Sequence, residues 1–155
     1  MSEMRRVTAI CNGTVIDHLP AGQAVKVLRM LGVTGERSNP VSLVMNVPSS
    51  KYGSKDIIKV EDRELTQEEL DRLALIAPHA SVAIIRNYSV AEKREVGLKE
   101  EIVDVATCTF SNCISLADRE PLPHRLVVVN EEPLKLRCHY CGRVQDAETL
   151  IDNVL

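Results

Sequence analysis

The sequence of 155 residues predicts an α+β protein with two domains, and three observations support this prediction. In its first two thirds, β-branched runs alternate with two amphipathic segments. A charged segment containing an isolated glycine follows, and short apolar runs separated by proline come after it. We therefore expect an antiparallel sheet with two helices on one face, a ferredoxin-like arrangement, and then a small all-β domain.

The first elements are predicted to be a hairpin and a helix. β-branched runs at residues 7–10 and 14–16 flank Asn12-Gly13, a dipeptide typical of hairpin turns. Pro20 ends the second run. Apolar residues then recur at a helical period from Ala21 until Gly32, which suits a carboxyl-terminal cap.

The next elements repeat this order. "PVSLVMNVPS" (40–49) and "SKDIIKVED" (54–62) are rich in β-formers and lie on either side of a short connection, so they are expected to pair. "LTQEELDRLALIAP" (65–78) predicts a helix with Thr66 and Glu69 as its capping box. "ASVAIIRNYSV" (80–90) predicts one further strand.

The domain boundary is expected within "AEKREVGLKEE" (91–101), which holds the only glycine between positions 54 and 141. We therefore expect domains at 1–97 and 98–155. In the second, residues 102–108, 124–130 and 134–141 are expected to form short strands. "DAETLIDNVL" (146–155) predicts a closing helix of about two turns.

Composition and charge exclude several classes of protein. With 45% hydrophobic and 26% charged residues, the chain can build a packed core. It has no apolar run of membrane-spanning length, and its amino terminus lacks a signal-peptide h-region, so we expect a cytoplasmic protein that does not bind membranes. Residues 99–155 hold 6 basic and 10 acidic residues, and the whole chain has no tryptophan and one phenylalanine. Both facts disfavour nucleic-acid binding.

The cysteines carry the strongest chemical signal. Cys108 and Cys113 are separated by four residues, Cys138 and Cys141 by two, and 24 residues lie between the pairs. In a reducing compartment this pattern predicts one tetrahedral structural zinc ion with four thiolate ligands. The alternatives are a thioredoxin-like redox pair and a catalytic zinc, but the first needs a strand-to-helix junction and the second an open ligand position. Cys11 is expected to be a thiol in or near the core.

Charged residues in the first domain suggest an anion site. Asp17 and His18 come where a strand gives way to a helix, and Lys55 and Lys59 share one strand face because they are four residues apart. Lys93 can join them. The simpler interpretation, that these side chains are only solvated, stays open at this point. No nucleophile has a matching base, so the residues predict no catalytic set.

In combination, several motifs closely resemble the regulatory chain of aspartate carbamoyltransferase. They are "GTVIDHLPAG", "SKDIIKVED", "LALIAPHASV", "NYSV" with a following lysine, "NCIS" and "LRCHYCG". The resemblance covers nearly the whole length. It implies a non-catalytic subunit of pyrimidine biosynthesis that binds CTP and ATP in the amino-terminal domain. It also implies a regulatory dimer that holds catalytic chains together through the zinc domain.

The resemblance further implies which residues contact the nucleotide. Those beside the base, ribose and phosphates would be Val7, Ala9, Ile10, Asp17, His18, Lys55, Lys59, Ile85, Tyr88, Val90 and Lys93. Thr8 and Ala83 depart from the family pattern at this site, and Phe110 and Gly142 depart from it in the zinc domain. The competing interpretations are a zinc-ribbon protein that binds nucleic acid and an enzyme that acts on nucleotides.

Overall fold

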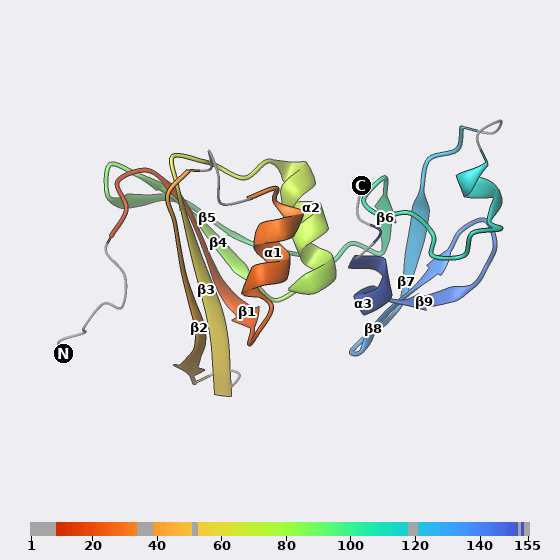
Figure 1. Ribbon diagram of the computed structural model, residues 1–155, viewed down its shortest axis with the longest axis horizontal. Coiled ribbons are helices and arrows are strands. Elements are labelled where there is room, and N and C mark those ends of the chain that lie inside the picture. The colour runs from red at the N-terminus through yellow and green to blue at the C-terminus, as the bar shows by residue number, and fades with distance from the viewer. Residues whose placement is uncertain (1–8, 34–38, 51–52, 118–120, 152, 154–155) are drawn as a thin grey trace. The chain divides into compact units, whose positions relative to one another are not determined.

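Figure 1 shows the computed structural model, which describes residues 9–33, 39–50, 53–117, 121–151 and 153. Contacts between Cα atoms divide the chain into two compact units. The first unit comprises Met1–Thr66 and His79–Val96, and the second comprises Gln67–Pro78 and Gly97–Leu155. Each unit is described by itself.

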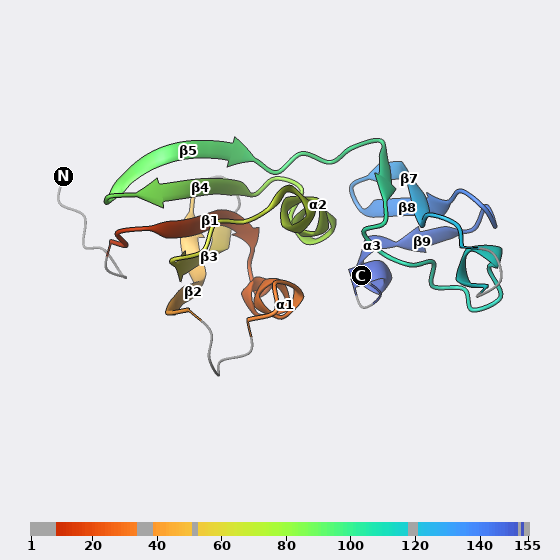
Figure 2. The same cartoon turned by 90° about the horizontal axis from the view of Figure 1, so that it is seen from above.

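The first unit is built on an antiparallel sheet of five strands in the order β2-β3-β1-β4-β5 (Figure 1). The bounds are β1 Gly13–Pro20, β2 Val41–Ser49, β3 Gly53–Glu61, β4 Ser81–Arg86 and β5 Ser89–Glu95, with helix α1 at Ala24–Met30. Alternate residues of the central strands, among them Ile16, Ile58 and Val82, are fully buried, as are Ala24 and Val27 of α1. Figure 2 shows α1 beside one face of this sheet. The other face carries the residues between the buried ones.

Two β-bulges lie on either side of β3. The register of β1 shifts between Ile16 and Leu19, and that of β2 shifts between Val44 and Val47. A fully buried carboxylate, that of Asp56 on β3, lies between the two bulges. It accepts hydrogen bonds from the backbone N–H groups of Asn46 in the β2 bulge (2.9 Å), of Gly22 (2.8 Å) and of Ala24 (3.0 Å). One side chain thus ties β2, β3 and the start of α1 together.

The predicted first hairpin is wrong over the described residues. Residues 9 and 10 are outside any strand, residues 11 and 12 form a bend, and β1 begins at Gly13 itself. Gly13 has φ of +147°, and a Cβ there would collide with the Val60 carbonyl oxygen. The glycine therefore permits close approach of β1 to β3 and does not make a two-residue turn.

The single strand predicted over residues 80–90 is also wrong. The chain turns at Asn87 and Tyr88, both with positive φ (51° and 63°), and β4 and β5 form a tight hairpin. Positive φ at both central residues is the conformation of a type I′ turn. The polar segment expected to begin the boundary is therefore largely an edge strand.

The second unit is a smaller antiparallel sheet in the order β6-β7-β8-β9 with helices beside it. Its elements are α2 Gln67–Ile76, β6 Glu101–Val103, a 3₁₀ turn at Ile114–Leu116, β7 Arg125–Glu131, β8 Leu134–Cys138, β9 Val144–Asp146 and α3 Ala147–Ile151. Its core joins Leu126, Leu136 and Leu150 with Leu75 of α2. The sequence prediction missed β9 and the 3₁₀ turn, and the closing helix is shorter than expected.

The predicted fold class is confirmed: an antiparallel sheet with helices is followed by a separate, small β region that contains the four paired cysteines. None of the helices in the described part of the chain is long and apolar enough to span a lipid bilayer.

Candidate metal centre and the open face of the first sheet

Two short loops bring the four cysteines of the second unit together. Cys108 and Cys113 flank a loop that runs into the 3₁₀ turn, and Cys138 ends β8 with Cys141 in the turn that follows. Gly142 has φ of +72° and donates its N–H to the Cys138 carbonyl at 3.0 Å. The glycine beside the second pair therefore folds this turn back toward β9.

The four sulfur atoms have the geometry of a tetrathiolate site. All lie within 4.8 Å of one another, with 3.8 Å between the sulfurs of Cys108 and Cys141 and 3.6 Å between those of Cys113 and Cys138. Four ligands at about 2.3 Å around a tetrahedral zinc ion stand about 3.8 Å apart. The cluster therefore fits one zinc ion, and four protein ligands leave no open position for catalysis.

The protein environment treats the thiols differently. Burial raises the pKa of Cys108 to about 12 and also raises the pKa of Cys138. Burial opposes ionisation of Cys113 too, but hydrogen bonds from the side chain and backbone of Ser115 outweigh it and lower its pKa to about 7. Since zinc binds thiolates, a bound cation must displace the protons of Cys108 and Cys138 at neutral pH.

A small surface cluster lies beside this centre. The Arg143 guanidinium stacks over the Phe110 ring, 4.8 Å from its centroid, and donates a hydrogen bond to the Asn112 side-chain oxygen at 2.6 Å. Phe110 is one of the departures from the family pattern noted above. Here it supports a cation at the surface of the second unit.

In the first unit, two of the predicted lysines lie in one row across the open face of the sheet. Lys59 on β3 pairs with Val15 on β1, Val15 pairs with Ala83 on β4, and Ala83 pairs with Lys93 on β5. Directly paired residues point to the same side, and three strand spacings separate the two lysines by about 15 Å. The row is therefore a small apolar floor between two cations.

Asp17, His18 and Lys55 are brought together by the β1 bulge. The Lys55 ammonium lies 2.9 Å from an Asp17 carboxylate oxygen, which also accepts the backbone N–H of His18 at 2.6 Å. His18 itself has φ of 60°. Asp17 pairs with Ser81, two residues before Ala83 on β4, so this ion pair lies about 7 Å along the strands from the row that contains Lys59 and Lys93.

Apolar residues lie at the opposite end of this face. Ile85 pairs with Val90, and the Tyr88 side chain in the adjoining turn is 70% exposed. The Tyr88 N–H donates to the Cys11 carbonyl at 2.9 Å, which places the chain beside Cys11 next to this turn. Ala9 is exposed, Ile10 and Ile85 are buried, and Val7 lies outside the described residues.

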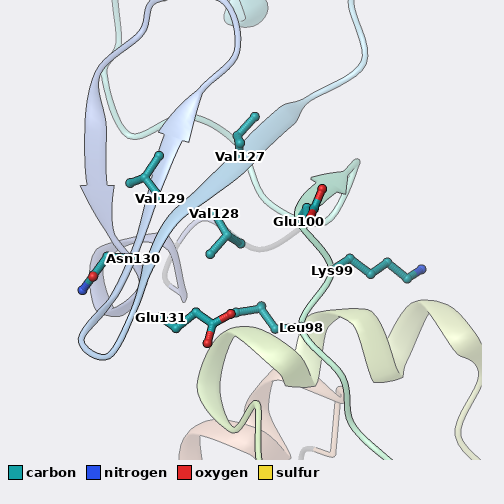
Figure 3. Close-up of a pocket in the computed structure, with 8 residues that line it drawn as sticks. All are labelled: Leu98, Lys99, Glu100, Val127, Val128, Val129, Asn130 and Glu131. Atoms are coloured by element: carbon teal, nitrogen blue, oxygen red, sulfur yellow. The ribbon is translucent and has the colours of Figure 1, made fainter.

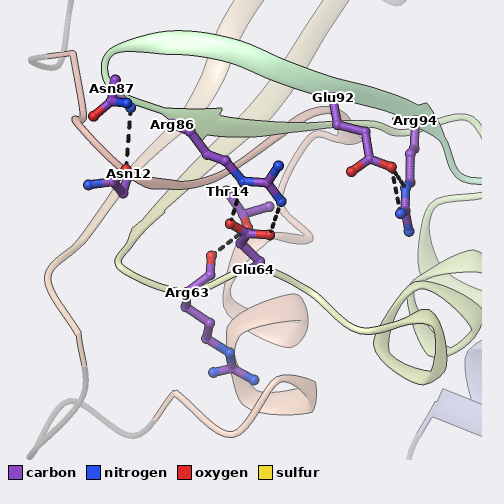
Figure 4. Close-up of polar contacts among 8 residues, drawn as sticks. All are labelled: Asn12, Thr14, Arg63, Glu64, Arg86, Asn87, Glu92 and Arg94. Carbon is purple, nitrogen blue, oxygen red and sulfur yellow. Dashed lines mark hydrogen bonds and ion pairs between the residues drawn. The ribbon is translucent and has the colours of Figure 1, made fainter.

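Two hollows in the structure contain none of the predicted site residues. One, of about 420 Å³, lies where β1 begins and β3 and β4 end, and its lining includes Arg63, Glu64 and Arg86. Arg86 donates two hydrogen bonds to the Glu64 carboxylate, at 2.6 and 2.9 Å, so both charges are already paired (Figure 4). The other, of about 470 Å³ in the second unit, lies between residues 98–100 and 127–131 (Figure 3).

Comparisons with known proteins agree across the chain. The family model described as aspartate carbamoyltransferase regulatory chain, allosteric domain, matches residues 5–97, and the model for the metal binding domain of the same chain matches residues 100–151. Three relatives carry the name aspartate carbamoyltransferase regulatory chain. That of Korarchaeum cryptofilum is 48% identical (99% of this chain, 98% of the relative), that of Thermococcus gammatolerans 47% (96% and 97%) and that of Ignicoccus hospitalis 50% (93% and 92%).

Proposed function

The chain belongs to the family of aspartate carbamoyltransferase regulatory chains, and from this premise we propose that it binds CTP and ATP as allosteric effectors and tethers catalytic chains. The family makes it a non-catalytic subunit with an allosteric and a metal-binding domain, whose partner is a catalytic chain. We assign nucleotide binding to residues 1–97 and the catalytic-chain contact to residues 98–155. The four free thiols of the proposed zinc centre suit a reducing cytoplasm.

The observation that carries the nucleotide proposal is the shared row of Lys59 and Lys93. Two ammonium groups on one face of a sheet favour a bound anion, and the floor between them consists of Val15 and Ala83, which can face a flat ring or a ribose. Asp17 and His18 extend the strip beyond the row, and Tyr88 and Val90 extend it on the other side. A nucleotide with base, ribose and phosphates matches this alternation of apolar and charged groups.

Lys55 has a different part in this proposal. Its ammonium is already neutralised by Asp17 at 2.9 Å, and its side chain is only 17% exposed. A phosphate would have to compete with that carboxylate for it. We therefore assign the main phosphate contacts to Lys59 and Lys93 and give Lys55 the task of holding Asp17 in place.

Regulation requires that the nucleotide bind two quaternary states with different affinities. A coupling free energy of about 1–3 kcal/mol changes affinity or activity by about 5- to 150-fold. The zinc domain is proposed to transmit this difference because it is the part held against the catalytic chain. The regulatory chains are proposed to pair as dimers, so that one assembly links more than one catalytic trimer.

The test is reconstitution with the cognate catalytic chain. The zinc-loaded regulatory chain is mixed with catalytic trimers, and the product is examined by sedimentation and by the rate of carbamoyl-aspartate formation with and without CTP or ATP. We expect a larger hetero-oligomer whose rate responds to nucleotide. Catalytic trimers that stay separate, or an assembly indifferent to both nucleotides, would contradict the proposal.

Two competing functions can be excluded by the same preparation. Filter binding of nucleic acid over a range of salt concentrations should show no steep salt-dependent affinity, whereas a zinc-ribbon protein that binds nucleic acid would show one. Incubation of the isolated chain with nucleoside triphosphates should yield no product. Turnover there would favour an enzyme that acts on nucleotides.

A further inference from the structure

A buried glutamine of the second unit contacts the metal centre without being a ligand. Gln145 on β9 is only 4% exposed. Its side-chain oxygen accepts hydrogen bonds from the backbone N–H and the hydroxyl of Thr109, both at 2.8 Å, and its side-chain nitrogen donates to the Cys108 sulfur at 3.1 Å. The residue therefore joins β9 to the loop that carries the first cysteine pair.

The orientation of this amide is determined by its neighbours. The Thr109 backbone N–H can only donate, so the atom that faces it must be the Gln145 oxygen. The NH₂ group is then directed at the Cys108 sulfur, which as a zinc-bound thiolate is an acceptor. A rotated amide would lose both contacts at once.

Charge gives the contact its importance. Four thiolates around a divalent cation carry a net charge of −2, and this charge lies among buried apolar residues in the more acidic part of the chain. Hydrogen bonds to sulfur stabilise that negative charge and fix the direction of the sulfur lone pairs. The backbone N–H of Phe110 also donates to Cys108, and Ser115, whose hydroxyl oxygen lies 3.0 Å from the Cys113 sulfur, serves the second ligand of the same loop.

We propose that Gln145 is a positioning residue of the zinc centre, which holds the Cys108 thiolate by a hydrogen bond and thereby slows release of the metal. Ser115 has the matching task at Cys113. The first cysteine pair would then depend on two side-chain donors, one of them from a strand that lies after the second pair in sequence. This inference rests on zinc occupying the four-cysteine site.

The test compares metal release from the full-length, zinc-loaded chain. Gln145→Glu keeps the size of the side chain and its acceptance from Thr109, but its carboxylate cannot donate to the thiolate. Gln145→Leu removes all three hydrogen bonds. Loss of a hydrogen-bond partner of a metal ligand typically weakens metal binding by about 10- to 100-fold, so we expect zinc transfer to a chromogenic chelator to accelerate by about tenfold or more in both variants.

A second readout separates the hydrogen bond from general loosening of the domain. In the Co²⁺-substituted chain, the sulfur-to-metal charge-transfer band reports the electron density on the thiolates. Removing a donor raises the energy of the sulfur lone pairs, so this band should move to longer wavelength in Gln145→Glu and in Ser115→Ala. Asp146→Asn, an exposed change on the same strand, should leave both the band and the release rate unchanged.

The outcomes are distinct. A charge-transfer band and a release rate in Gln145→Glu equal to those of the unmodified chain overturn the role of Gln145 while the metal centre stands. An unmodified chain that binds neither Zn²⁺ nor Co²⁺ overturns the metal centre and the inference with it.

Discussion

At the scale of single residues, two neighbouring cations on β5 lie on opposite faces of the sheet. Lys93 pairs with Ala83 on the open face, whereas Arg94 pairs with Val82, whose side chain is fully buried. Arg94 is also 2.6 Å from Glu92. The two residues carry the same charge, so a comparison between them isolates position from charge.

Lys93→Ala should weaken CTP binding by about 10- to 100-fold, because a hydrogen bond to a charged group contributes about 1.5–3 kcal/mol. Isothermal titration calorimetry on the zinc-loaded chain measures the change. Arg94→Ala is the matched control and should bind CTP nearly as the unmodified chain does. Equal affinities in the two variants would remove Lys93 from the nucleotide site.

Asp56 shows how one buried carboxylate can maintain the shape of the open face. Replacing it with alanine leaves the N–H groups of Gly22, Ala24 and Asn46 without their acceptor. At about 1 kcal/mol for each lost bond, Asp56→Ala should lower the free energy of unfolding by about 3 kcal/mol. Urea denaturation checks this value. Asp56→Asn keeps an acceptor oxygen and should lose less, and a midpoint unchanged in Asp56→Ala would show that these bonds are dispensable.

At the scale of elements, the start of β1 depends on the absence of a side chain at Gly13. A Cβ there meets the Val60 carbonyl oxygen of the neighbouring strand, and φ of +147° is unfavourable for any other residue. Gly13→Ala should therefore destabilise the first unit by about 2 kcal/mol or more. Thermal unfolding of the zinc-loaded chain is the measurement.

Gly22→Ala provides the control for that experiment. Gly22 also has positive φ, +87°, but a Cβ there has no atom within 4 Å. It should show only the cost of the backbone conformation, about 1 kcal/mol. If the two substitutions lowered the melting temperature equally, close approach of β1 to β3 would not be the reason for glycine at position 13.

At the scale of the whole molecule, the metal and the nucleotide are expected to act in different units. All the proposed nucleotide contacts belong to the first unit, and all four cysteine ligands belong to the second. A mercurial that reacts with thiolates should release one zinc per chain and separate the assembly into active catalytic trimers and regulatory chains that still bind CTP. Sedimentation and a zinc indicator follow the two events.

Cys11→Ser controls for the fifth thiol, which lies in the first unit. The variant should dissociate at the same mercurial dose as the unmodified chain, because Cys11 is not part of the four-sulfur cluster. An assembly that stays intact after its zinc has been released would mean that the metal centre does not support the contact with the catalytic chain.

Much of the chain could be predicted locally. The spacing of Cys108, Cys113, Cys138 and Cys141 indicated a metal site because two short loops with two thiols each are sufficient for a tetrahedral ion. The parity of Lys55 and Lys59 placed them on one strand face, and the helical periods located α1 and α2. Each of these signals depends only on residues near one another in sequence.

Tertiary structure alone decided the rest. The row from Lys59 to Lys93 depends on strand order, the place of Asp56 on two bulges, and the contact of Gln145 on a strand of three residues that has no periodicity of its own. In each case a residue acquires its task from partners more than ten positions away in sequence or on another strand. Hydrogen bonds and packing at such separations form only when the chain closes on itself, so no local pattern of residues encodes them.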